Sequence, residues 1–369
     1  MTDTRARLCL TMIVKDEAAI IERCLAAAAP WIDAWAIHDT GSSDDTAEII
    51  TSFFDRQGLP GRLTHGRFDD FAQARNDSLA AARDTAAAEG ADYLLLCDAD
   101  MELVVEDPAF RAALTADAYL LEQRASGLDY ANVRLVRVDA PARYVGVTHE
   151  YLDVGEAVRP LLGGAWFRDH AEGASREVKF ERDLALLERG IADEPDNVRY
   201  RFYLAQTLRD LGRHREAVAA YERRAALGGW EEEVWYSLLQ VAVLRERLGD
   251  DDHDVLTAYL TAYERRPGRA ETLVELARHL RERGRHHLAH VFATRAVELG
   301  PTEDILFVSS GAYGWRARDE LAVSSYWVGR YDESAALAQA LLADPALPVD
   351  ERARVEQNLA FAREQASLH

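Results

Sequence analysis

The feature that most constrains this chain is a glycine that recurs through its second half. Gly212, Gly249, Gly284 and Gly329 follow one another at intervals of 37, 35 and 45 residues, and each joins two stretches rich in Ala, Leu, Glu and Arg. A glycine in that place suits the end of one helix and the turn into the next. The prolines that separate successive stretches are Pro195, Pro267 and Pro301. The second half is therefore predicted to be an array of helix pairs.

A period near 34 residues with small residues inside the second helix resembles the tetratricopeptide repeat. The last interval is stretched and residues 309–316 are irregular, so the number and register of repeats after residue 302 stay open. Such repeats stack into a curved solenoid whose concave face suits an extended peptide or a protein partner. A non-repetitive helical bundle is the alternative interpretation.

The first half has a different pattern of apolar residues. Short apolar runs alternate with helical patterns, as in a βαβ sheet. We expect a first domain over residues 1–175 and a helical domain over 176–369. The expected strands are 8–14, 35–38, 93–97 and, more loosely at the edge of a mixed sheet, 118–123, 132–138 and 146–154. The expected helices are 17–29, 44–54 with Ser43 as the N-cap, and 70–88.

Composition excludes several classes of protein. Asp and Glu number 64 against 43 Lys and Arg, and a net charge of −21 disfavours general binding to nucleic acid. No apolar stretch is long enough to span a membrane, and the N-terminus does not resemble a signal peptide. Cys9, Cys24 and Cys97 lie within apolar segments and are expected to be small buried side chains in a reducing compartment. We expect a cytoplasmic protein.

Polar residues follow three of the predicted strands. Lys15-Asp16-Glu17 ends the first, Asp39 ends the second, and Asp98-Ala99-Asp100 follows the third. Ligands of open α/β sheets bind beyond the carboxyl ends of the strands, and paired carboxylates there suit a divalent cation on a diphosphate. Arg75, at the start of a helix, is placed to donate to a carbonyl or phosphate. The alternative for this arginine is a salt bridge to Asp39 or Asp70.

Four motifs in this order resemble those of family 2 glycosyltransferases of the GT-A fold. They are Leu10-Thr11-Met12-Ile13-Val14-Lys15-Asp16-Glu17, Ile37-His38-Asp39-Thr40-Gly41-Ser42, Asp69-Asp70-Phe71-Ala72-Gln73-Ala74-Arg75-Asn76 and Leu96-Cys97-Asp98-Ala99-Asp100. The whole chain is similar to the subgroup in which tetratricopeptide repeats follow the catalytic domain, which includes the peptide S-glycosyltransferases that make glycocins. The resemblance implies an α/β GT-A domain with a Rossmann-like mixed sheet, followed by an all-α solenoid.

By this resemblance the first domain binds a nucleotide-diphosphate sugar, foremost a UDP-sugar. Glu17 and Asp39 would hold ribose and base, Asp98 would face the ribose or a metal-bound water, and Asp100 would ligate Mg²⁺ or Mn²⁺. His170 matches a histidine that closes the metal site in many GT-A enzymes, although Ala171-Glu172-Gly173 departs from the family's pattern. The residues expected to contact the nucleotide sugar are Thr11 through its main chain, Lys15, Glu17, Asp39, Arg75, Asp98, Lys179 and Arg182.

Two further groups complete the expected site. Arg134-Leu135-Val136-Arg137 and then Tyr144 to Glu150 resemble the subgroup's arginine-leucine segment followed by a glycine and a His-Glu pair. Glu150 is the candidate base, with His149 as the residue that orients or replaces it. The alternative is that either pairs with Arg143 or Arg159. Lys179 and Arg182 follow at helical spacing and would neutralise the departing diphosphate, or form an ordinary solvated helix face.

The function expected is therefore an inverting, metal-dependent hexosyltransferase that acts on a Ser, Thr or Cys side chain of a peptide or protein. A small-molecule or polysaccharide acceptor stays open, as does a homodimer formed through the repeats. Two alternatives are a nucleotidyltransferase, which also uses paired carboxylates and metal, and a non-catalytic repeat scaffold with a relic first domain. Against the nucleotidyltransferase, Lys15-Asp16-Glu17 stands where a glycine-rich phosphate loop would be.

Overall fold

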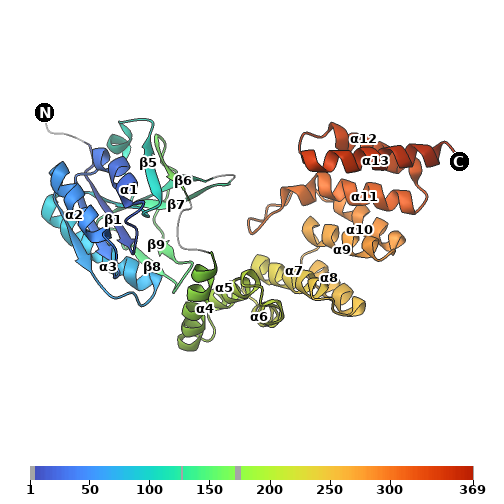
Figure 1. The fold of residues 1–369 in the computed structure, drawn as a ribbon, viewed down its shortest axis with the longest axis horizontal. Coiled ribbons are helices and arrows are strands. Elements are labelled where there is room, and N and C mark those ends of the chain that lie inside the picture. The colour runs from blue at the N-terminus through green and yellow to red at the C-terminus, as the bar shows by residue number, and fades with distance from the viewer. Residues whose placement is uncertain (1–4, 126–127, 171–175, 369) are drawn as a thin grey trace. The chain divides into compact units, whose positions relative to one another are not determined.

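The structure is a computed structural model that describes residues 5–125, 128–170 and 176–368. The chain divides into two compact units, Met1–Gly190 and Ile191–His369 (Figure 1). The division falls later than the boundary expected after residue 175, because most of helix α4 (Arg176–Asp193) belongs to the first unit. Residues 171–175, which include the departure from the family pattern, lie outside the described residues.

An eight-stranded mixed sheet forms the centre of the first unit. Its spatial order is β3-β2-β1-β4-β7-β6-β10-β5, and the first four strands are parallel. The strands are β1 (Leu8–Val14), β2 (Ala34–Asp39), β3 (Gly61–His65), β4 (Tyr93–Leu96), β5 (Met101–Val105), β6 (Ala118–Ala125), β7 (Leu128–Arg137) and β10 (Ala165–Asp169). Because β1, β2 and β4 run in the same direction, their carboxyl ends lie at one edge of the sheet.

Helices cover both faces of the parallel strands, which explains why β1, β2 and β4 are almost wholly buried, whereas β3 at the edge of the sheet is partly exposed. Leu8, Leu10 and Met12 of β1 pack in the same core cluster as residues of α1 and α2, whereas Cys9 packs with α3 on the other face. The helices are α1 (Ile21–Ala28), α2 (Thr46–Gln57) and α3 (Phe71–Glu89), with the short 3₁₀ helices η1 (Ala29–Trp31) and η2 (Phe110–Ala113). All three cysteines are free and buried, as expected.

Some local expectations are corrected. Ser43 does not cap α2; its main-chain N–H and hydroxyl donate to Asp16, and the carboxylate of Asp44 accepts from the N–H of Thr46 instead. The expected strand over 146–154 is a hairpin of β8 (Arg143–Val145) and β9 (Tyr151–Asp153), which forms a separate two-stranded sheet. Gly146 has a φ of 115°, which ends β8 and begins the loop that carries Glu150.

The second unit is a series of antiparallel helix pairs, which confirms the expected repeats. Each of the four recurring glycines follows the first helix of a pair with a φ between 71° and 81°, a conformation that favours glycine. The helices are α5 (Val198–Asp210), α6 (His214–Ala226), α7 (Glu231–Arg247), α8 (Asp252–Arg265), α9 (Ala270–Glu282), α10 (His286–Glu298), α11 (Trp315–Trp327), α12 (Tyr331–Ala343) and α13 (Val349–Ala366). The irregular segment before α11 contains η3 (Ser310–Tyr313).

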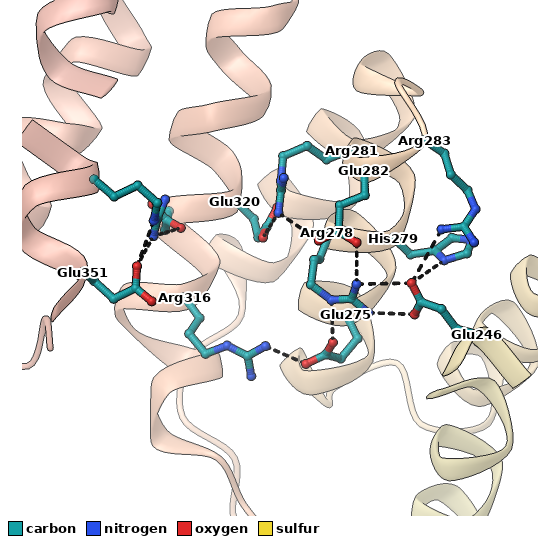
Figure 2. Close-up of polar contacts among 12 residues, drawn as sticks. Glu246, Glu275, Arg278, His279, Arg281, Glu282, Arg283, Arg316, Glu320 and Glu351 are labelled. Carbon is teal, nitrogen blue, oxygen red and sulfur yellow. Dashed lines mark hydrogen bonds and ion pairs between the residues drawn. The ribbon is translucent and has the colours of Figure 1, made fainter. Parts of the chain in front are cut away.

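Ion pairs connect the first helices of successive pairs, in addition to apolar packing (Figure 2). The pairs and their N–O distances are Glu246–Arg278 from α7 to α9 at 2.7 Å, Glu275–Arg316 from α9 to α11 at 2.6 Å, Arg281–Glu320 from α9 to α11 at 2.7 Å, and Asp319–Arg354 from α11 to α13 at 2.9 Å. These contacts give four arginines of the repeats a partner on a neighbouring helix. Within the described residues, no helix is long and apolar enough to cross a membrane.

Candidate functional site

The candidate site lies at the carboxyl edge of β1, β2 and β4. Asp39 is the last residue of β2 and pairs in register with Val14, the last residue of β1. Asp98 follows β4, and the main-chain N–H of the preceding Cys97 donates to the carbonyl of Thr11 in β1. The neighbouring strand ends thus carry acidic residues on adjacent loops, as the sequence predicts.

Arg75 is the central cation of this edge. It lies on the first turns of α3, where its Nη2 donates to Asp98 Oδ1 at 2.8 Å and its Nε donates to Glu150 Oε1 at 2.6 Å. Its guanidinium also lies 5.4 Å from the ring centroid of Tyr144. A planar fork can hold two carboxylates at once. The alternative partners considered for Arg75, Asp39 and Asp70, are replaced by Asp98 and Glu150.

Asp98 has a second arginine partner that the sequence analysis did not assign to the site. Arg134 of β7 lies 2.9 Å from Asp98 Oδ2, and its Nε and Nη2 donate to Gln123 Oε1 of β6 at 3.1 and 2.5 Å. Gln123 is fully buried and Arg134 nearly so. The sequence does show that Arg134 is flanked by apolar residues in a predicted strand. Such an arginine is expected to be buried, and a buried arginine requires an acidic or polar partner.

Charge is distributed unevenly among the acidic residues. Burial by itself would raise the pKa of Asp98, but Arg75 and Arg134 outweigh it and hold this pKa well below its ordinary value. Burial together with the charges of Asp98 and Asp169 raises the pKa of Asp100 to about 6. Burial and the charge of Asp100 are the largest causes that raise the pKa of Glu17 to about 7. The neighbouring cations therefore compensate the ionised forms of Asp100 and Glu17 poorly.

The expected metal ligands do not form a three-residue cluster. His170 Nε2 lies 3.0 Å from Glu102 Oε2, and both oxygens of Asp98 are occupied by arginines. In the part of the chain that the structure describes, no group of three His, Cys, Asp or Glu side chains is placed to hold a metal ion. That Asp98, Asp100 and His170 hold a metal ion together stays a prediction. Magnesium commonly uses one or two carboxylates together with substrate phosphates, and Asp100 fits that pattern.

Glu150 and His149 lie in the loop between β8 and β9. The loop is fixed to α3, because Asn76 exchanges two hydrogen bonds of 2.9 Å with the main chain of Tyr144, and the N–H of Phe71 donates to the carbonyl of Val147. His149 is exposed and has a φ of 50°. Glu150 pairs with Arg75, not with the Arg143 or Arg159 considered from sequence.

Asp39 is buried and organises the turn that follows it. Its Oδ1 accepts from the N–H groups of Gly41 and Ser42 and from the Ser42 hydroxyl, at 2.8 to 2.9 Å. Its Oδ2 lies 3.6 Å from His65 Nδ1 at the end of β3. One oxygen of Asp39 is therefore used by its own loop, and the other faces the sheet edge beside an exposed histidine.

Thr11 lies in the middle of β1, and Lys15 follows the last residue of this strand. The main chain of Thr11 lies within the ladder between β2 and β4, and its hydroxyl lies 2.8 Å from Ser78 Oγ. Thr11 also lines a cavity of about 10 Å³ with Arg75, which is room for about one water. Thr11 thus shapes the site from within the sheet. Lys15 is exposed at the edge.

The two basic residues expected to face the diphosphate lie on α4. The guanidinium of Arg182 lies 4.7 Å from the ring centroid of Phe71, and its Nη2 is 3.5 Å from Asp183 Oδ1. Lys179 is exposed. Arg182 therefore covers the start of α3, and its contacts are those of a packed helix face.

Comparison with known proteins identifies relatives of the repeats. No family model matches the chain. A TPR repeat-containing protein of Synechococcus elongatus is 29% identical over 321 residues, which span 80% of this chain and 76% of that protein. Because the second unit makes up only about half of the chain, this match extends into the α/β unit.

Solved structures with tetratricopeptide repeats are also similar to part of the chain. A MamA protein is 14% identical, with 45% of this chain and 83% of that chain covered and a TM-score of 0.37. A thermophilic TPR protein of Thermus thermophilus is 20% identical, with 50% and 92% covered and a TM-score of 0.36. A tetratricopeptide repeat protein of Parabacteroides merdae is 19% identical, with 52% and 71% covered and a TM-score of 0.38.

Proposed function

We propose that the α/β unit is a GT-A-type glycosyltransferase that inverts the anomeric carbon of a nucleotide-diphosphate sugar, foremost a UDP-sugar, and transfers the sugar to a peptide or protein. The observation that carries this proposal is the arrangement at the sheet edge. Asp98 is neutralised by Arg75 and Arg134, while Asp100, two residues further, and Glu17 on the adjacent loop are not. Such a sheet edge can bind a metal cation. The cation can in turn neutralise the anionic diphosphate of a bound nucleotide sugar.

Each residue of the edge has a distinct part in this proposal. Asp39 Oδ2, whose partner oxygen is held by the following turn, would accept from the base, and Glu17 would accept from the ribose hydroxyls. Arg75 would act as a positioning residue that fixes Asp98 and Glu150 relative to each other. Mg²⁺ or Mn²⁺, held by Asp100 and the diphosphate, would supply positive charge at the leaving group.

Glu150 is the candidate base for the transfer. The acceptor hydroxyl or thiol would give its proton to a Glu150 oxygen as its oxygen or sulfur bonds to the anomeric carbon. The bond between that carbon and the diphosphate oxygen breaks at the same time, and the nucleoside diphosphate leaves with the electron pair. The ion pair with Arg75 holds the Glu150 carboxylate in place for this step.

The test is a product analysis with purified full-length chain, a panel of UDP-, GDP- and dTDP-sugars, and Mn²⁺. Slow release of nucleoside diphosphate and free sugar supports a glycosyltransferase, because water replaces the missing acceptor. Glu150→Gln should lower this rate by at least about 100-fold, while Glu156→Gln, an exposed glutamate of the following loop, should leave it unchanged. Release of nucleoside monophosphate and sugar 1-phosphate would instead indicate a nucleotidyltransferase, and absence of turnover with every donor would favour the repeat scaffold.

A further inference from the structure

The connection between α10 and α11, residues 299–314, is the longest between consecutive helices of the second unit (Figure 1). Residues 304–309 of this connection, here called the strap, cross the beginnings of α7 and α9. The Glu232 carboxylate of α7 accepts from the main-chain N–H groups of Ile305 and Leu306 at 2.9 and 2.7 Å. The Glu271 carboxylate of α9 accepts from the N–H of Ser309 at 2.9 Å. Two nearly buried carboxylates thus bind the main chain of the strap.

Two arginines of the connection between α8 and α9 also bind the strap. Arg269 is fully buried, and its guanidinium donates to the carbonyl of Leu306 at 3.1 Å and to Asp304 Oδ2 at 3.2 Å. Arg266 donates to both oxygens of Asp304. Asp304 is therefore the strap side chain that the helices recognise by charge, and a bidentate arginine gives that recognition a defined geometry.

The apolar side chains of the strap are held differently. Phe307 contacts the rings of Phe202 and Tyr236, at centroid distances of 6.5 and 4.6 Å, yet it remains 51% exposed. Ile305 is 80% exposed. A segment that belonged to the core would bury these side chains. A segment held by main-chain hydrogen bonds, one carboxylate and one half-covered ring resembles a bound extended peptide instead.

The two most buried groups that bind the strap, Arg269 and Glu271, remain paired without it. Arg269 donates from Nε and Nη2 to the two oxygens of Glu271, both at 3.0 Å, and its guanidinium lies 3.8 Å from the ring centroid of Trp235. If the strap were released, Arg269 would therefore keep its two hydrogen bonds to Glu271 and its contact with the ring of Trp235. A left-handed φ of 47° at Phe307 adds a conformational cost to the bound strap.

We propose that this face of α5, α7 and α9 binds an extended acidic peptide of a partner protein, with an Asp or Glu three positions before an aromatic residue, and that the strap occupies the face as an internal ligand. The partner's carboxylate takes the place of Asp304 on Arg266 and Arg269, and its aromatic ring takes the place of Phe307 on Tyr236. The inference concerns binding alone and holds whether or not the α/β unit transfers a sugar.

The test uses a fluorescein-labelled peptide with the sequence of residues 302–310 and full-length chain, followed by fluorescence polarisation. The double variant Asp304→Ala/Phe307→Ala weakens the strap and should bind the peptide at least tenfold more tightly than the wild type. The matched variant Glu303→Ala/Ile305→Ala changes one exposed side chain just before the strap and one exposed side chain within it, and should bind like the wild type. Equal affinity of all three proteins, or undiminished binding of a peptide whose Asp and Phe are replaced by Ala, would overturn the proposal.

Hydrogen exchange on the wild-type chain keeps the proposal testable if the double variant does not fold. The amides of Ile305, Leu306 and Ser309 should exchange at least 100-fold faster than the amides in the middle of α9, because the strap opens without unfolding the helices. The unlabelled peptide in excess should accelerate this exchange further by occupying the vacated face. Strap amides that exchange as slowly as those of α9, with or without peptide, would make the strap a permanent structural element and refute the proposal.

Discussion

Replacing Glu246 by glutamine should destabilise the repeat unit by about 2 kcal/mol at neutral pH. Glu246 lies on α7 and accepts a hydrogen bond of 2.7 Å from Arg278 Nη2 on α9 and another of 2.7 Å from the Tyr259 hydroxyl on α8. His279 Nδ1 lies 2.9 Å from its Oε1 (Figure 2). One carboxylate therefore joins three helices of two successive pairs, and glutamine keeps its shape but removes its charge.

The magnitude follows from the proton affinity of this carboxylate. Burial alone would raise the pKa of Glu246, but the contacts from Arg278, Tyr259 and His279 lower it from 4.5 to about 2. Each pKa unit corresponds to about 1.4 kcal/mol, which gives an upper limit of about 3 kcal/mol. Because 13% of the side chain is exposed, water screens part of the interaction, and we expect about 2 kcal/mol.

The pH dependence has a defined sign. A pKa that is lower in the folded state stabilises the protein fully above the unfolded value near 4.5, and the contribution is lost as the pH falls toward about 2. Urea unfolding followed by circular dichroism should therefore give the full difference between wild type and Glu246→Gln at pH 7. At a pH of about 3 this difference should fall to roughly half or less.

Glu282→Gln is the matched control. Glu282 contacts the same Arg278 at 2.9 Å, but 46% of its side chain is exposed, so its removal should cost no more than about 0.5 kcal/mol. Two results would refute the reasoning: equal effects of the two substitutions at pH 7, or a difference between wild type and Glu246→Gln that increases on acidification.

Three further predictions concern the α/β unit. Arg75→Lys keeps a charge but loses the fork that holds two carboxylates, and should cost roughly 2 kcal/mol in urea unfolding; an unchanged midpoint would contradict the bridging role. Gly61→Ala would place a methyl group against the carbonyl of Trp35 and should cost roughly 1–3 kcal/mol, whereas Gly163→Ala, which meets open space, should be neutral or slightly stabilising. Asp70→Ala removes the N-cap of α3 and should lower stability by about 1 kcal/mol, measured by thermal unfolding.

The repeats could be predicted from sequence because their signal is local and recurs. A glycine after a helix indicates a left-handed backbone conformation at that residue, and four such glycines indicate the length of the repeat. The strap could not be predicted, because its position depends on Glu232 and Arg269, residues far away in the chain. Residues 309–316 showed only that the pattern fails there. Strands β3, β5 and β10 were missed because each has only five residues, which carry too little pattern.

The candidate site could be predicted in part for the same reason. That Asp39 and Asp98 lie at one edge follows from the parallel strands that precede them. Which cation meets which carboxylate depends on geometry between elements: Arg75 reaches Glu150 because Asn76 fixes the β8–β9 hairpin to α3. The pairing of His170 with Glu102 depends similarly on β10 and β5 lying antiparallel. Neither pair, Arg75 with Glu150 or His170 with Glu102, can be predicted from spacing along the chain.

The most direct test of the proposed donor site is a thermal-shift panel of UDP, GDP, dTDP and their common sugars, each with and without Mn²⁺. We predict that one nucleotide raises the unfolding midpoint and that Mn²⁺ increases this rise, since a ligand at 100 times its Kd stabilises the folded state by about 2.7 kcal/mol. Asp100→Asn should abolish the Mn²⁺-dependent part, and Asp55→Asn, an exposed aspartate at the end of α2, should leave it intact. No shift with any nucleotide at millimolar concentration, or a shift that Asp100→Asn leaves unchanged, would contradict the account.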